Sequence, residues 1–217
     1  TLCLIIAVSL STPNSMYAAP HQVRFSDEEP AADRGGPRRD ARGGVPGEGY
    51  TWVDNDEETG PEYFWHEISH LGERLDATDD WNSGPLDLGW SFEFYGNQFE
   101  SINVCSNGWA SFTNESSVFD QVQLPSGSEP FNLLAVQWMD LDPEEIGDIY
   151  FWSDPDEEIA IVSWIGIPPW NMGENRRQTF QLIIKGDGSI VYQFADRNPP
   201  ANNIWMSIRI QNEDGSE

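Results

Sequence analysis

Cysteine and basic side chains are scarce in this chain. The first shortage argues against a disulfide-stabilised protein, and the second argues against a nucleic-acid-binding protein. The 217 residues include two cysteines, and 11 Lys or Arg side chains against 37 Asp or Glu side chains. Cys3 lies in a segment that we expect to be removed, so Cys105 has no partner for an intrachain disulfide in the mature chain. The fold therefore depends on its hydrophobic core, for which 10 Trp, 11 Phe and 6 Tyr residues supply large side chains.

The shortage of basic residues is most marked after residue 49, where 31 acidic side chains stand against 6 basic ones. Such a field repels nucleic acid phosphates and anionic lipid head groups, and it attracts divalent cations and basic partners. Nucleic acid binding is thereby disfavoured. The alternative interpretation is that the acidic surface only keeps an extracellular protein in solution.

Long hydrophobic runs are also lacking, since the apolar stretch within residues 1–19 is shorter than the ~20 residues that a membrane span needs. This uncharged segment resembles a signal peptide that is incomplete at its N-terminus, which predicts a secreted or cell-surface protein. Residues 20–48 are rich in Pro, Gly and charge, which predicts a disordered linker or pro-segment. The folded module is expected at residues 49–217, with a C-terminus that is itself a truncation.

From residue 49 onward, short apolar runs alternate with Gly, Pro, Asn and Asp, a pattern typical of an all-β protein. We predict a β-sandwich of two mostly antiparallel sheets. The predicted strands cover residues 50–53, 62–68, 86–94, 101–105, 109–112, 132–139, 147–152, 158–165, 178–185, 189–194 and 204–211.

The most regular part of this pattern lies in residues 85–112. Apolar side chains occupy every second position, as in a strand with one buried face: Leu86, Leu88, Trp90, Phe92 and Phe94. Turns at Tyr95-Gly96-Asn97 and Asn107-Gly108 then predict a β-meander, because Asn and Gly tolerate the positive φ of tight turns.

Several of these stretches resemble a known family. FYG at residues 94–96, SNGW at residues 106–109 and WMDLDP at residues 138–143 are similar to a β-sandwich module of large secreted bacterial proteins, and more distantly to nidogen-like extracellular domains. The resemblance covers about residues 49–217 and implies a non-catalytic adhesive or accessory module in a longer multidomain chain. It brings no catalytic residues.

One motif favours a different class of protein. His66, Glu67 and His70 match the zincin pattern, in which two histidines one helical turn apart bind zinc and the glutamate activates water. The pattern requires a helix, whereas a strand would place the two histidines about 13 Å apart, at roughly 3.3 Å per residue. A zinc-dependent metallopeptidase is therefore the alternative function.

Acidic loops offer a second candidate site. Alternating carboxylates are the hard oxygen ligands that calcium prefers, although none of these loops matches the spacing of an EF-hand. We select Asp140, Asp142 and Glu144 as calcium candidates, because they follow the buried strand predicted at residues 132–139, which would hold them rigidly. The alternative is a set of solvated loop acids.

Three tryptophans lie in or beside predicted loops and are candidates for ligand contact: Trp81, Trp170 and Trp205. Tryptophan at the rim of a β-sandwich can stack on sugar rings, although it can equally belong to the core. The sequence thus predicts a secreted binding or adhesion module for an extracellular protein or glycan, with calcium as a possible bridge. The remaining alternative is a structural spacer between neighbouring domains.

Overall fold

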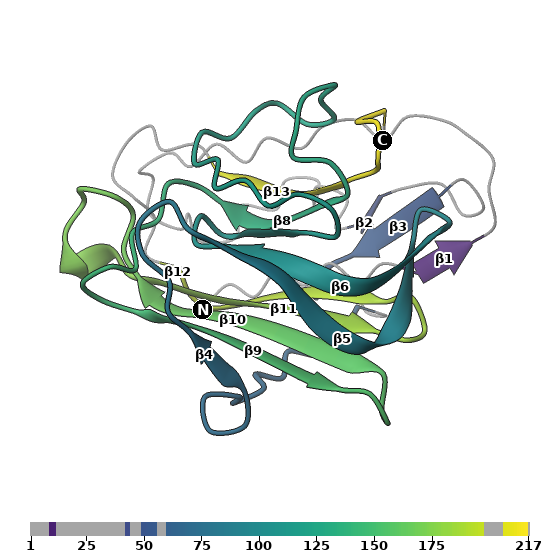
Figure 1. The fold of residues 1–217 in the computed structure, drawn as a ribbon, viewed down its shortest axis with the longest axis horizontal. Coiled ribbons are helices and arrows are strands. Elements are labelled where there is room, and N and C mark those ends of the chain that lie inside the picture. Colours follow the sequence, from purple (N-terminus) through teal and green to yellow (C-terminus); the bar gives the residue numbers. More distant parts are fainter. Residues whose placement is uncertain (1–8, 12–41, 44–48, 56–59, 198–205, 217) are drawn as a thin grey trace, which may run out of the picture.

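The chain forms a β-sandwich in the computed structural model, which describes residues 9–11, 42–43, 49–55, 60–197 and 206–216 (Figure 1). Sheet A has the order β12 (Ile190–Arg197), β11 (Gln178–Lys185), β10 (Ile159–Ile167), β9 (Asp148–Asp154) and β4 (Glu73–Leu75). Sheet B has the order β13 (Ser207–Gln211), β8 (Leu133–Trp138), β7 (Trp109–Ser111), β6 (Asn97–Cys105) and β5 (Asn82–Phe94). All pairings within the two sheets are antiparallel.

These findings confirm the predicted all-β sandwich. The described residues contain no α-helix, and their single turn of 3₁₀ helix is η1 (Glu174–Arg176). No helix among them is long and apolar enough to cross a membrane.

The main core lies between the two sheets, and β5 supplies much of it. Leu88, Trp90, Phe92 and Phe94 are buried, whereas the residues between them are exposed. This alternation follows from the pleat of a strand, which sends successive side chains to opposite faces. β5, β6 and β7 are consecutive antiparallel neighbours, which confirms the meander predicted for residues 85–112.

The central strand of sheet A is buried on both faces. Ala160, Val162 and Trp164 of β10 face the main core. On the outer face, Ile161 packs in a smaller cluster with Ile183 of β11 and with Ile68. Both faces of β10 are thus covered, as its nearly continuous apolar sequence predicts.

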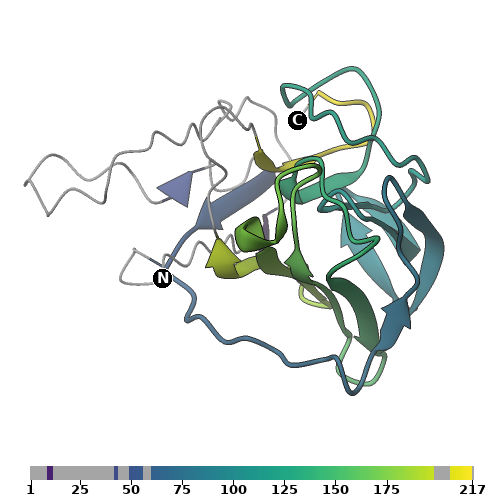
Figure 2. The same cartoon turned by 90° about the vertical axis from the view of Figure 1, so that its left-hand side faces the viewer.

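Residues 61–72, here called the strap, cover the outer face of sheet A before the chain enters β4. Figure 2 shows this blue segment passing below the green strands of sheet A. The strand predicted at residues 62–68 is wrong, because the strap pairs with no described strand. Its Ile68 is held instead by side-chain burial between β10 and β11.

A third, small sheet has the order β1 (Ser9–Ser11), β3 (Gly49–Val53) and β2 (Arg42–Gly43). Tyr50 of β3 packs against the core beside Phe94 and Tyr95, which connects β3 to the sandwich. Apart from β1 and β2, the predicted signal peptide and linker lie outside the described residues. Those two predictions remain untested.

Candidate functional site

Three carboxylates from two distant parts of the chain converge at one end of the sandwich. Asp79 and Asp80 form the turn before β5, and Asp140 follows β8. One oxygen from each lies within 4.8 Å of the others, and we call these three residues the acidic cluster. Calcium binds oxygens at 2.3–2.6 Å, so ligands of one ion lie within about 5 Å of each other. The spacing of the acidic cluster satisfies this limit.

The fully buried side chain of Asn107 joins the segments that carry the acidic cluster. Its Nδ2 donates to Asp80 Oδ1 at 2.9 Å and to the carbonyl of Ser117 at 3.3 Å. Its Oδ1 accepts from the amide of Leu141 at 2.8 Å, directly after Asp140. A single amide side chain, with both a donor and an acceptor group, thus positions both acidic segments.

Main-chain contacts reinforce this arrangement. Ser106 and Trp81 exchange two hydrogen bonds, since the Ser106 amide donates to the Trp81 carbonyl at 2.9 Å and the Trp81 amide donates to Ser106 Oγ at 2.9 Å. Gly108 has φ +76°, and a Cβ there would lie 2.2 Å from the carbonyl oxygen of Gln137. The SNGW sequence at residues 106–109 is therefore the framework under the acidic cluster.

None of the three carboxylates forms an ion pair with a basic side chain of the described residues. Partial burial and the negative charges of Asp80, Asp79, Asp120 and Asp142 raise the pKa of Asp140 to about 6. Burial also raises the pKa of Asp79, whose Oδ1 is shielded from water and accepts no hydrogen bond. A cation at this position would relieve both penalties.

The acidic cluster shares one residue with the calcium candidates selected from the sequence. Asp140 is retained, but its neighbours in space are Asp79 and Asp80 rather than Glu144, which is exposed and outside the cluster. Asp142 Oδ1 accepts a hydrogen bond from the Glu144 amide at 2.9 Å, which closes the local turn. Asp79 and Asp80 belong to another of the acidic loops that the sequence offers, directly before Trp81, and their proximity to Asp140 is visible only in the structure.

The histidine motif lies in the strap, which is not helical there. Residues 61–68 have no regular secondary structure, and a turn follows at residues 69–71. The main chain of His66 is fixed to sheet A by Gln181, which accepts from its amide at 3.3 Å and donates to its carbonyl at 2.8 Å. The helical face that a zincin site requires is therefore absent from the strap.

The side chains of the motif have separate surroundings. The His66 ring contacts the Phe64 ring edge-on at a centroid distance of 5.0 Å, and partial burial lowers its pKa. Glu67 Oε1 accepts from the Ser69 amide at 3.0 Å, and His70 is exposed. Among the described residues, these three groups form no cluster with metal-ligand spacing.

The three tryptophans also differ. Trp81 is half-buried and packs against the main core. Trp170 is 51% exposed, and its amide donates to the Asp140 carbonyl at 3.0 Å, so it lies beside the acidic cluster. Trp205 lies outside the described residues. Of the three, Trp170 combines exposure with a position next to the cluster.

Comparison with known families adds one finding. A family model described as NIDO related matches residues 63–216. The matched range includes both sheets of the sandwich and all three residues of the acidic cluster. No solved structure matches the chain.

Proposed function

The chain belongs to the NIDO-related family, and on this premise we propose that it is a non-catalytic extracellular module that binds calcium at the acidic cluster. Membership of this family favours an accessory role over catalysis, and nidogen-like domains are in general extracellular. In this proposal the cation links the module to an extracellular protein or glycan.

One observation carries the proposal, namely the convergence of Asp79, Asp80 and Asp140 on a buried framework. Solvated surface acids spread apart, because like charges repel and each carboxylate gains by hydration. Here Asn107 holds the two acidic segments together, and Asp79 Oδ1 accepts no hydrogen bond. Oxygen ligands in a fixed arrangement are what a calcium site needs.

Trp170 gives the site a surface for a partner. It presents about half of its side chain to solvent, directly beside the Asp140 loop. A tryptophan face can stack on a sugar ring or on an apolar side chain, and aromatic residues often dominate binding energy at interfaces. A partner that donates oxygen ligands to the cation would therefore reach Trp170 as well.

Isothermal titration of calcium into the full chain tests the cation site. The wild-type chain should bind one calcium ion, and Asp80→Asn or Asp140→Asn should abolish measurable binding. Asp80→Asn is informative because asparagine retains the oxygen that accepts from Asn107. Glu144→Gln is the matched control, since it removes a nearby charge outside the acidic cluster. Absence of calcium binding, or equal loss in the control, would overturn the proposal.

A further inference from the structure

A second surface lies away from the acidic cluster, where the edge of sheet A meets sheet B. An open groove of about 340 Å³ is lined there by the end of the strap, the start of β4, β5 and the end of β9. Leu71 and Trp152 give it apolar walls, and Glu73 and Asp87 belong to its lining as carboxylates. The groove thus combines apolar surface with negative charge.

The strap extends this surface beyond the groove. Three of the six large hydrophobic side chains exposed in the described residues lie on it: Tyr63 at 40%, Phe64 at 67% and Leu71 at 58%. Leu71 also lines the groove, so the two surfaces are continuous. Burial of Ile68 and the hydrogen bond from Gln181 attach the strap to sheet A, so the exposed side chains of the strap project from an anchored main chain.

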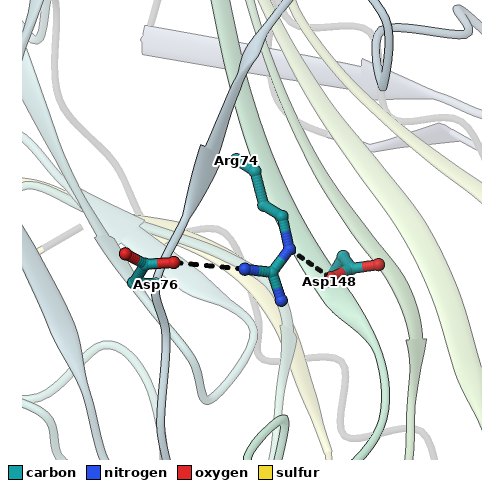
Figure 3. A network of polar contacts seen from close by, with 3 residues as sticks. All are labelled: Arg74, Asp76 and Asp148. Atoms are coloured by element: carbon teal, nitrogen blue, oxygen red, sulfur yellow. Dashed lines mark hydrogen bonds and ion pairs between the residues drawn. The ribbon is translucent and has the colours of Figure 1, made fainter.

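The carboxylates of the groove are not neutralised within the described chain. Arg74, which follows Glu73, points to other acids, with its Nε 2.6 Å from Asp148 and its Nη1 3.1 Å from Asp76 (Figure 3). Neither Glu73 nor Asp87 forms an ion pair with a basic side chain of the described residues. The groove therefore offers its negative charge to a partner.

Charge decides which partner fits. A second copy of this chain would bring its own 31 acidic and 6 basic side chains after residue 49, so the two copies would repel. An arginine matches the groove better, because its planar guanidinium both pairs with carboxylates and stacks on aromatic faces such as that of Trp152. Apolar neighbours of that arginine would contact Leu71 and Phe64.

We propose that the strap and the groove form a docking surface for an extended segment of another protein that carries arginine next to apolar residues. This surface shares no residue with the acidic cluster, so the proposal does not depend on calcium binding.

Fluorescence anisotropy with model peptides tests this proposal on the full chain in the presence of EDTA. The probe is a labelled octapeptide that alternates arginine and leucine, and a second peptide that alternates arginine and serine carries the same charge. We expect the arginine–leucine peptide to bind at least about tenfold more tightly, because the leucines contact the strap. The variant Leu71→Ser should remove that difference, since its side chain joins the strap to the groove.

Matched variants separate local recognition from general electrostatic attraction. The double variant Glu73→Gln/Asp87→Asn should weaken binding about tenfold, as expected for two neutralised contacts to an arginine. The double variant Glu100→Gln/Glu115→Gln changes the net charge equally at exposed positions outside the groove and should leave affinity within about twofold. Asp140→Asn should also have no effect.

Three results would overturn the docking surface. They are equal affinity for the two peptides, equal loss in the Glu100→Gln/Glu115→Gln control, and no binding of either peptide at millimolar concentration. None of these results bears on calcium binding at the acidic cluster, so the two proposals fail separately.

Discussion

The acidic cluster and the histidine motif of the strap both suggest metal binding in the sequence, but only the acidic cluster has its side chains at metal-ligand spacing in the structure. The three carboxylates of the cluster lie close together although they come from segments 60 residues apart, and the buried Asn107 joins these two segments. His66, Glu67 and His70 are neighbours in the sequence, yet the strap is not helical and they do not converge. In this chain, metal-ligand spacing arises where a buried side chain joins two distant loops, and it does not arise in the contiguous histidine motif.

The difference has a physical cause in what lies beneath each region. The acidic cluster rests on SNGW, which is buried and whose Ser106 and Asn107 form hydrogen bonds with the two acidic segments. The strap lies on the outer face of sheet A and is held by the burial of Ile68 and by Gln181. That attachment orients the main chain of the motif and leaves His70 in solvent.

The largest expected effect concerns the turn beneath the acidic cluster. Gly108→Ala should lower the free energy of unfolding by about 3 kcal/mol or more, because the left-handed backbone alone costs about 1–3 kcal/mol and the new Cβ meets the Gln137 carbonyl. Gly96→Ala is the control, since Gly96 has a similar φ of +79° but open space around its Cβ position. Its cost should stay near 1 kcal/mol. Urea unfolding of both variants measures the difference, and equal losses would show that the framework is not tightly packed.

The next effect compares the two candidate sites directly. Asn107→Ala should lower the free energy of unfolding by about 2–3 kcal/mol, because it leaves the Leu141 amide and the Asp80 carboxylate without their partner. His70→Ala, in the exposed part of the strap, should change it by less than about 0.5 kcal/mol. Urea unfolding again provides the measurement. Similar values for the two variants would remove the contrast between the regions.

The smallest expected effect concerns the reactivity of Cys105, the residue directly before the SNGW framework. Burial raises the pKa of the Cys105 thiol to about 12, so it should resist iodoacetamide in the folded protein at pH 8 and react only after unfolding. His70, which is exposed, should react with diethyl pyrocarbonate under native conditions. Mass spectrometry of the peptide that contains Cys105 separates it from Cys3. Rapid native alkylation of Cys105 would indicate that the framework opens readily.

The sequence predicts most of the sandwich, because the alternation in β5 and the Asn-Gly turn between β6 and β7 are local signals. It misses β4, whose three residues are too few to show a period. It also predicts a strand in the strap, since an apolar segment that covers a sheet has the same composition as a strand within one.

The candidate site is harder to predict. Asp140 was identified because it follows a buried strand, and that reason holds in the structure. Its pairing with Asp79 and Asp80 depends on how β5 and β8 are placed in sheet B and on the side chain of Asn107. No periodicity or spacing reports such a contact. The groove likewise forms only where the strap, β4, β5 and β9 come together in space, which the sequence does not show.

Terbium luminescence tests most directly whether the acidic cluster, and not the histidine motif, is the metal site. Terbium takes the same oxygen ligands as calcium. Trp81 follows Asp80 in the chain and the Trp170 amide donates to the Asp140 carbonyl, so both tryptophans lie beside the cluster as sensitisers. We expect tryptophan-sensitised emission that calcium displaces, that persists in His66→Ala/His70→Ala and that is lost in Asp80→Asn/Asp140→Asn. Emission that persists in the aspartate variant and disappears in the histidine variant would contradict the account.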